Sequence, residues 1–137
     1  MVKKSFISHY FEDKSGERLR KTITPDWKTT KSHLKLLDIP ENINSVLEVG
    51  CGIGRLLREL NVTIPICVGF DASSDMIREG QEYCAGTNIQ ILKCDGYGIL
   101  PIVNVEFDYA FSIITFQHIP NTETVIGYVS EMHRLLK

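Results

Sequence analysis

The 137-residue sequence lacks several features that would place it in a specialised class of protein. No uninterrupted apolar run approaches the 18 or more residues that would suggest a membrane span. The residues behind Lys3 and Lys4 are too polar for a secretion signal. The 10 glycines and 5 prolines are spread along the chain, which argues against disorder or low-complexity repeats for the chain as a whole. We therefore expect a cytoplasmic protein of one globular domain.

The four cysteines form no Cys-x-x-Cys pair, and they have no metal-ligand spacing with the four histidines. Three of the residues Cys51, Cys67, Cys84 and Cys94 lie inside or beside apolar runs. Buried thiols in a reducing compartment account for them most simply, and no metal site is predicted.

Neither sign of charge dominates, because the net charge is only −2, but the two signs are unevenly distributed. Residues 1–37 carry a net charge of +5, and residues 38–137 a net charge of −7. A basic arm before an acidic body could help to hold an anionic partner such as RNA. A solvated, lysine-rich face explains the same composition without a partner, and we favour that interpretation.

The hydrophobic pattern predicts alternating helices and strands from about residue 24 onward. Thr24-Pro25 has the residue types of a helix start, and Trp27, Thr30, Leu34 and Leu37 share one helical face. Strands are predicted over 46–49, 66–70, 89–92 and 109–116, and helices over 55–60, about 73–84 and from 123 to the end. Because the strands are apolar on both faces, we expect an α/β fold with an open, doubly wound, mainly parallel sheet.

A glycine-rich turn follows the first predicted strand. That strand ends at Glu48-Val49 and leads into Gly50-Cys51-Gly52-Ile53-Gly54. Glycines allow a tight turn and let a ligand approach the backbone closely. Asp71, at the end of the second strand, is positioned to accept hydrogen bonds from two ribose hydroxyls. The combination predicts a nucleoside site, in preference to glycines that serve only a strand-to-helix turn.

The glycine spacing favours one class of nucleoside. The dinucleotide fingerprint G-x-G-x-x-G, started at Gly50, requires a glycine at position 55, where Arg55 stands. A nicotinamide-dependent oxidoreductase is therefore disfavoured. Glu48 followed by G-x-G-x-G resembles motif I of the class I S-adenosylmethionine-dependent methyltransferases, where this stretch cradles the methionine end of the cofactor. The resemblance implies a Rossmann-like fold and S-adenosylmethionine as cofactor.

The resemblance extends over residues 45–137. Residues 93–96 look like the family's adenine site, where an Asp takes the exocyclic amine, and residues 107–119 like its fourth strand and the loop beside the reactive sulfur. Residues 1–44 are then an N-terminal arm and helix that form a cap, and residues 45–137 are the cofactor-binding core. The cofactor-binding residues implied are Glu48, Gly50, Cys51, Gly52, Gly54, Asp71, Ala72, Met76, Asp95, Gly96, Thr115 and Gln117. Met76 can equally be a core residue, and Asp95 an ordinary turn former beside Gly96.

The resemblance implies methyl transfer by in-line displacement at a sulfonium, for which the protein mainly aligns the reactants and excludes water. A base helps when the acceptor must lose a proton, and His118 is the candidate. A loop histidine bonded to the backbone is the alternative. His9 and Tyr10 lie on an arm that closes over the pocket in relatives, and Trp27 belongs either to that lid or to the core.

Family members continue with a fifth strand and antiparallel sixth and seventh strands, whereas this sequence stops at Lys137. We therefore expect the last strands of the family fold to be missing. Strand four would then be an exposed apolar edge that a second copy of the chain could cover. A non-catalytic S-adenosylmethionine-binding module, or an inactive fragment, is accordingly the second hypothesis.

The acceptor has few signals in the sequence. No Asn-Pro-Pro-Tyr-like segment follows strand four, and no Pro-Cys dipeptide is present. These absences disfavour methylation of exocyclic base amines and cysteine-dependent methylation of cytosine. A small-molecule acceptor is therefore favoured over a nucleic acid or a protein.

Overall fold

The structure is a computed structural model that describes residues 27–102 and 104–137, with side chains from Thr30 onward. His9, Tyr10, the predicted helix start at Thr24-Pro25 and the side chain of Trp27 lie outside the described residues. The elements are α3 (Trp27–Leu34), β1 (Ser45–Val49), α4 (Arg55–Leu60), β2 (Ile66–Asp71), α5 (Ser74–Tyr83), β3 (Ile89–Lys93), β4 (Tyr109–Phe111), the 3-10 turn η1 (Phe116–His118) and α6 (Thr122–Arg134).

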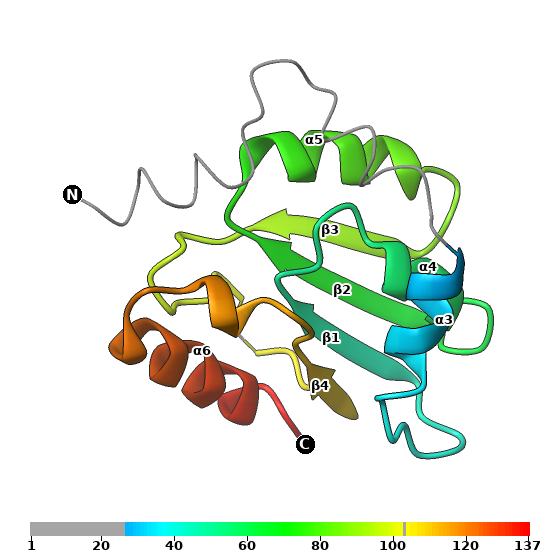
Figure 1. Ribbon diagram of the computed structural model, residues 1–137. Coiled ribbons are helices and arrows are strands. Elements are labelled where there is room, and N and C mark those ends of the chain that lie inside the picture. Colours follow the sequence, from blue (N-terminus) through cyan, green and yellow to red (C-terminus); the bar gives the residue numbers. More distant parts are fainter. Residues whose placement is uncertain (1–26, 103) are drawn as a thin grey trace.

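The strands form one parallel sheet in the order β3-β2-β1-β4 (Figure 1). In its register, Val46 of β1 pairs with Cys67 of β2 and with Tyr109 of β4. The chain leaves β1 on one side for β2 and β3 and returns to the other side for β4, so the strand order reverses next to β1. The predicted α/β fold with a parallel sheet is confirmed.

Side-chain alternation along the strands builds one hydrophobic core on each face of the sheet. Val46 and Cys67 belong to the core under α4 and α5, whereas Leu47 and Val68 belong to the core under α6. The same alternation of period two places Glu48 on the α4 face, beside the glycine loop. A carboxylic acid therefore stands where the pattern calls for an apolar side chain.

Local capping explains where α5 and α6 begin. Ser73 Oγ accepts a hydrogen bond from the Met76 amide, and Asn121 Oδ1 accepts from the amides of Glu123 and Thr124. These side chains satisfy amides that have no partner within the helix. The predicted start of a helix at about residue 73 is confirmed.

The predicted strand over residues 109–116 is wrong in length, because β4 ends at Phe111. Ile114 has φ +57°, in the left-handed region that a strand does not use. The hydroxyls of Ser112 and Thr115 donate to the carbonyls of Val49 and Gly50, at 2.8 and 3.3 Å. Side-chain hydrogen bonds therefore hold this segment against the end of β1, and it does not pair with β1 as a strand.

The last predicted helix also ends earlier than expected. α6 stops at Arg134, and the Phe107 amide then donates to Leu135 O at 2.7 Å while the Lys137 amide donates to Phe107 O at 3.1 Å. These bonds make an isolated parallel bridge between Phe107 and Leu136 next to β4. Apart from this bridge, β4 is an edge strand of the sheet among the described residues. That a second copy of the chain covers this edge stays a prediction.

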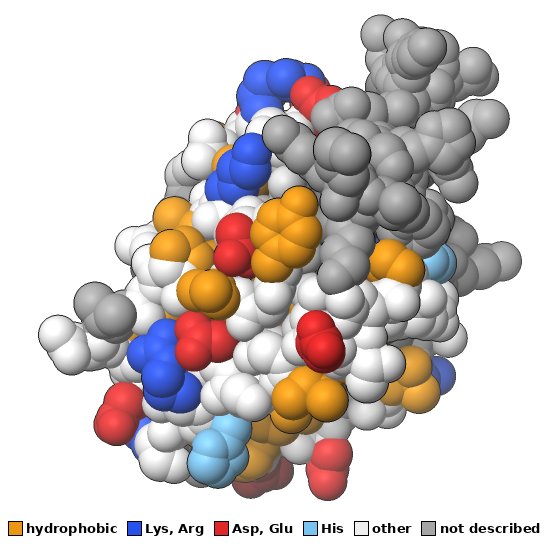
Figure 2. All heavy atoms as spheres, turned by 90° about the vertical axis from the view of Figure 1, so that its left-hand side faces the viewer, with side chains coloured by type: hydrophobic (Ala, Val, Ile, Leu, Met, Phe, Trp, Pro, Cys, Tyr) orange, Lys and Arg blue, Asp and Glu red, His pale blue; other side chains and the backbone are white. Residues whose placement is uncertain are grey.

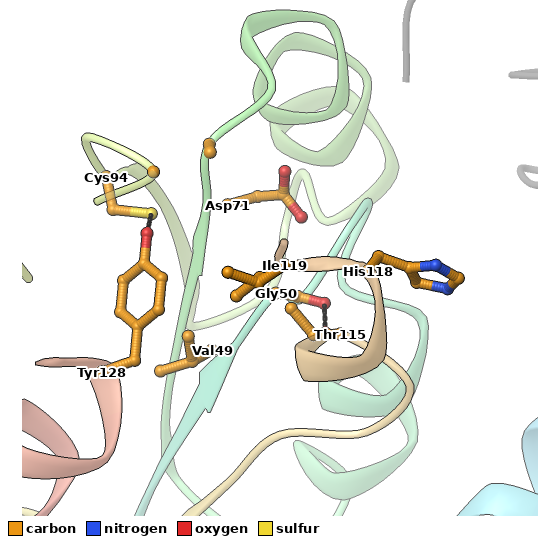
Figure 3. Close-up of a pocket in the computed structure, with 10 residues that line it drawn as sticks. Val49, Gly50, Asp71, Cys94, Thr115, His118, Ile119 and Tyr128 are labelled. Atoms are coloured by element: carbon orange, nitrogen blue, oxygen red, sulfur yellow. Dashed lines mark hydrogen bonds between the residues drawn. The ribbon is translucent and has the colours of Figure 1, made fainter. Parts of the chain in front are cut away.

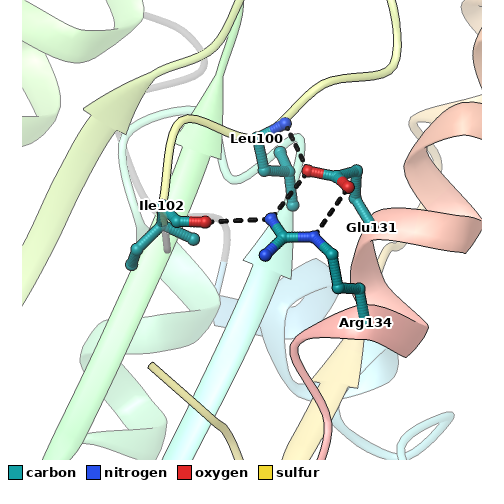
Figure 4. A network of polar contacts seen from close by, with 4 residues as sticks. All are labelled: Leu100, Ile102, Glu131 and Arg134. Carbon is teal, nitrogen blue, oxygen red and sulfur yellow. Dashed lines mark hydrogen bonds and ion pairs between the residues drawn. The ribbon is translucent and has the colours of Figure 1, made fainter. Parts of the chain in front are cut away.

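An ion pair on α6 holds the loop that follows β3 (Figure 4). Arg134 contacts Glu131 at 2.8 Å and also donates to the carbonyl of Ile102. Glu131 accepts from the Leu100 amide at 3.2 Å. The loop between β3 and β4 is thereby fixed against α6. None of the helices in the described part of the chain is long and apolar enough to cross a membrane.

Candidate cofactor-binding site

The glycine loop makes a close turn over the end of β2. The amides of Gly50 and Cys51 both donate to the carbonyl of Phe70, at 2.7 and 3.0 Å. Gly50 has φ +77°, and a Cβ atom there would overlap the side chain of Thr115. A residue with a side chain could not take this position, because the segment after β4 lies directly against the backbone.

Asp71 holds the loop from the end of β2. Its side chain is 3% exposed, and its two carboxylate oxygens accept from the amides of Gly52 and Ser73, both at 2.9 Å. Burial raises the pKa of this carboxyl, and hydrogen bonds from the backbone of Ser73, Gly52 and Ala72 oppose that shift. Because a carboxylate oxygen can accept two hydrogen bonds, each oxygen retains capacity for a ligand hydroxyl.

Glu48, on the neighbouring strand β1, is a second buried carboxyl group. It is 3% exposed, and its Oε2 has no hydrogen-bond partner. Burial, followed by the negative charge of Asp71, raises the pKa of Glu48 to about 8, while Arg55 acts in the opposite direction. Glu48 is therefore mainly protonated at neutral pH.

Two cavities meet at these residues and share Gly50, Asp71, Thr115 and His118. The first has a volume of about 50 Å³ and is mainly apolar, with Val49, Ala72, Cys94, Gly96, Ile119 and Tyr128 completing its wall. The second has a volume of about 270 Å³ and is lined by Glu48, Gly52 and Met76 together with His33 and Arg55. Figure 3 shows Tyr128 and Cys94 on one side of Asp71 and the His118 ring on the other.

The structure brings most of the predicted site residues to these cavities. Glu48, Gly50, Cys51, Gly52, Asp71, Ala72, Met76, Gly96, Thr115 and His118 each line at least one of them. The glycine loop, the end of β2 and the segment after β4 therefore converge, although they are far apart in the sequence.

Three predicted residues lie outside both cavities. A Cβ atom at Gly54 would come within 2.9 Å of Cys84 Sγ and of Ile91, so this glycine permits close packing of α4. Asp95 is exposed, and its Oδ1 accepts from the Tyr97 amide at 2.8 Å, as a turn former does. Gln117 is exposed, and its Nε2 lies 3.2 Å from Nε2 of His118.

Several lining residues were not predicted as site residues. Cys94 Sγ and the Tyr128 hydroxyl lie 3.3 Å apart in a buried contact that closes the first cavity. Thr124 and Tyr128, one turn apart on α6, are the buried residues of that helix, and this spacing was the available signal. Two other lining residues are Arg55 and His33. Arg55 was noted only because it stands where the dinucleotide fingerprint requires a glycine, and no sequence pattern indicated a role for His33.

All four cysteines are buried free thiols, which confirms their predicted burial. Burial raises the pKa of each of them, so the thiolate form is disfavoured. Within residues 27–102 and 104–137 no group of three or more His, Cys, Asp or Glu side chains could hold a metal ion.

A sequence profile described as "Methyltransferase domain" matches residues 46–137. The chain belongs to this methyltransferase family. The predicted membership of the class I S-adenosylmethionine-dependent methyltransferases is thereby confirmed. An uncharacterised methyltransferase of Mycobacterium tuberculosis strain H37Rv is 30% identical over 103 residues, which cover 74% of this chain and 52% of the relative. The chain thus spans about half the length of the curated relatives that it matches.

Several solved structures have the same fold. The plantazolicin methyltransferase BamL, in complex with a triazolic desmethylPZN analog and SAH, matches with a TM-score of 0.71 and 22% identity over 99% of this chain and 52% of its own. SAM-bound CalS10, an amino pentose methyltransferase from Micromonospora echinaspora, matches with a TM-score of 0.69 and 16% identity over 92% and 53%. The PH0226 protein of Pyrococcus horikoshii matches with a TM-score of 0.71 and 25% identity over 83% and 55%.

Proposed function

We propose that this chain binds S-adenosylmethionine at the carboxyl ends of β1 and β2 and transfers the methyl group to a small-molecule acceptor. One observation carries the proposal. Asp71, which retains acceptor capacity, stands where an apolar cavity meets a more polar one beside a turn of glycines. A nucleoside with an amino-acid tail presents its groups in the matching order: an apolar base, then the ribose hydroxyls, then a polar tail.

The two cavities would receive the parts of the cofactor in order. The first cavity, with Ala72, Cys94 and Tyr128 in its wall, offers apolar surfaces for a base. Asp71 at the junction can accept from the ribose hydroxyls. The second cavity, beside Gly52 and Glu48, is left for the methionine end, where the absence of side chains on the glycines allows close approach.

The bound cofactor would supply an activated methyl group on a sulfonium. The residues of this chain would orient it and keep water away, with Thr115 and Ile113 on the wall of the second cavity. His118 lines both cavities, so its imidazole is placed to take a proton from a hydroxyl or amine acceptor.

The face of the described residues in Figure 2 favours a small acceptor over a nucleic acid. Figure 2 views the molecule from the side at which the strands end, and its Lys and Arg side chains are scattered among acidic and hydrophobic ones. A nucleic-acid interface usually gathers Lys and Arg on one face.

Transfer of labelled methyl groups into a fractionated cell extract tests this proposal. We expect the label in the small-molecule fraction, and at least a tenfold lower rate in His118→Ala, because proton removal by a positioned base typically contributes 10²–10⁴-fold. His133→Ala, which removes an exposed histidine of α6 that lines neither cavity, is the matched control. Label in RNA or protein would contradict the acceptor class, and cofactor binding without label in any fraction would identify a non-catalytic module.

A further inference from the structure

Ile114, in the segment that follows β4, has a backbone conformation that disfavours its own side chain. Its φ is +57°, in the left-handed region. Within residues 27–102 and 104–137, the other non-glycine residues with positive φ are Asn42 and Asn104, and asparagine adopts this region far more readily than isoleucine. The conformation of Ile114 therefore costs free energy that an asparagine or a glycine would avoid.

Hydrogen bonds on both sides of Ile114 hold it in this conformation. On one side, Ser112 Oγ donates to Val49 O at 2.8 Å. On the other side, Thr115 Oγ1 donates to Gly50 O at 3.3 Å. The end of β1 therefore fixes the segment before and after the strained residue. Conformations that the surrounding structure imposes in this way occur mainly at functional sites.

The side chain of Ile114 contributes little to the packing of the fold. It is 48% exposed, and in the described part of the chain it belongs to neither hydrophobic core. It lines the second cavity together with Thr115 and His118. Neither the backbone nor the core explains an isoleucine at this position, so we infer that its side chain contacts a ligand.

The acceptor suits this position better than the cofactor does. Glu48 and Asp71, which line the same cavity, are each 3% exposed and lie deep in it, whereas Ile114 is about half exposed and lies nearer the opening. His118, the proposed base, is four residues further along the same segment and lines the same cavity. A base must reach the nucleophilic atom of the acceptor, so the acceptor would lie beside this segment.

We propose that Ile114 determines acceptor specificity by contacting an apolar group next to the nucleophilic atom of the acceptor. This inference rests on the proposed function and narrows its acceptor to small molecules with an alkyl or aryl group beside a hydroxyl or amine. Contact with such a group removes the exposed surface of Ile114 from water. Ile113 and Ile119, which line the second and the first cavity, extend the apolar wall on either side.

Ile114→Asn separates the acceptor contact from the fold, because asparagine tolerates the left-handed region. In urea unfolding, the ratio of folded to unfolded chain should rise on the order of fivefold as the strain is relieved. Calorimetric titration should show less than a twofold change in the affinity for S-adenosylhomocysteine. Ile126→Asn, which replaces another exposed isoleucine on α6 that lines neither cavity, is the matched control and should show no such rise in stability.

The acceptor contact is measured by methyl transfer. Labelled methyl groups are followed from S-adenosylmethionine into the small-molecule fraction of a cell extract. We expect a rate about tenfold lower in Ile114→Asn at limiting extract, and a smaller loss when extract is in excess. Ile114→Val keeps a β-branched apolar side chain and should recover most of the rate, whereas Ile126→Asn should transfer methyl groups at the wild-type rate.

The chemical class of the acceptor is measured on the labelled product. Partition between ethyl acetate and water, once at acidic and once at alkaline pH, prevents ionisable groups from deciding the result. We expect the label to enter the ethyl acetate in at least one of the two extractions.

Four outcomes overturn the inference while the proposed function stands. Undiminished transfer in Ile114→Asn would show that the acceptor does not contact this side chain. A loss of affinity for S-adenosylhomocysteine as large as the loss of transfer would assign Ile114 to the cofactor. Unraised stability in Ile114→Asn would remove the strain on which the argument depends, and label that stays in water at both pH values would exclude an apolar acceptor. A wild-type chain that binds no S-adenosylhomocysteine, or that binds it and transfers no label, would instead overturn the proposed function and this inference with it.

Discussion

The Asp71 carboxylate accepts the amide hydrogen of Gly52 at 2.9 Å, across a separation of 19 residues in the sequence. One side chain therefore shapes the glycine loop and presents hydrogen-bond acceptors at the junction of the two cavities. Loop geometry and ligand binding are consequently coupled through Asp71.

Replacing Asp71 should affect both properties. We expect Asp71→Ala to weaken binding of S-adenosylhomocysteine by about 1–3 kcal/mol, because the ribose hydroxyls lose their acceptor. The free energy of unfolding should fall as well, since the buried amides of Gly52 and Ser73 also lose theirs. Titration calorimetry and urea unfolding measure the two effects. Asp38→Ala, at an exposed position, is the control, and unchanged affinity in Asp71→Ala would remove Asp71 from the site.

Glu48 should make the stability depend on pH. Its pKa is about 8 in the folded chain and 4.5 as the ordinary value, so the folded state retains a proton that the unfolded state loses between these two pH values. The wild-type chain should therefore lose stability as the pH rises from about 4.5 to 8. Glu48→Gln keeps the neutral shape and removes this loss, so the variant should be the more stable one by on the order of 3 kcal/mol at pH 7.

Urea unfolding of both chains at several pH values between 4.5 and 8.5 checks this expectation. The difference between the free energies of unfolding should widen with pH and then level off above about 8. A constant difference across the range would show that Glu48 is ionised in the folded chain.

Asp108 should act in the opposite sense. It accepts from the Asn44 and Ser45 amides and pairs with Lys137 at 2.8 Å, and these partners lower its pKa to about 2. A carboxylate with a lowered pKa stabilises the fold above its ordinary pKa of 3.8, and this contribution is lost as the pH falls through 2.

Asp108→Asn should therefore be less stable than the wild-type chain at pH 6, and the difference should shrink as the pH falls from about 4 to 2. Unfolding followed by circular dichroism at each pH measures it. A difference that persists unchanged at pH 2 would mean that the contacts of Asp108 do not depend on its charge.

Gly69 marks a position where a side chain has no room. A Cβ atom there would lie 2.6 Å from Cys51 Sγ and 2.7 Å from Leu57, both of them buried. We expect Gly69→Ala to destabilise the chain by about 1–3 kcal/mol through overpacking. Adding Cys51→Ala removes one of the obstructing atoms and should recover part of the loss in urea unfolding. Independent, additive effects of the two substitutions would argue against this contact.

The parallel sheet and the glycine loop could be predicted because their signals are local. Continuous apolar strands, the cap at Ser73 and the spacing of the glycines each depend on neighbouring residues. The end of β4 could not be predicted, because it depends on hydroxyls that reach the carbonyls of Val49 and Gly50, more than 60 residues away in sequence.

The residues of the candidate site also form two groups: those that local sequence signals predict, and those that depend on contacts between distant elements. Asp71 and the loop glycines are recognised by their position after a strand, whereas Arg55 and His33 line one cavity only because α3 brings them together across 22 positions. The contact of Cys94 with Tyr128 similarly joins residues 34 positions apart. Such pairs depend on how the helices pack, and the hydrophobic period of a helix does not specify which polar residues meet.

The central claim is that the crevice at the ends of β1 and β2 binds S-adenosylmethionine rather than a dinucleotide. Calorimetric titration of the purified 137-residue chain with S-adenosylhomocysteine, and in parallel with NAD, tests it most directly. Binding of S-adenosylhomocysteine alone is the predicted result. Binding of NAD alone, or of neither ligand, would contradict the claim.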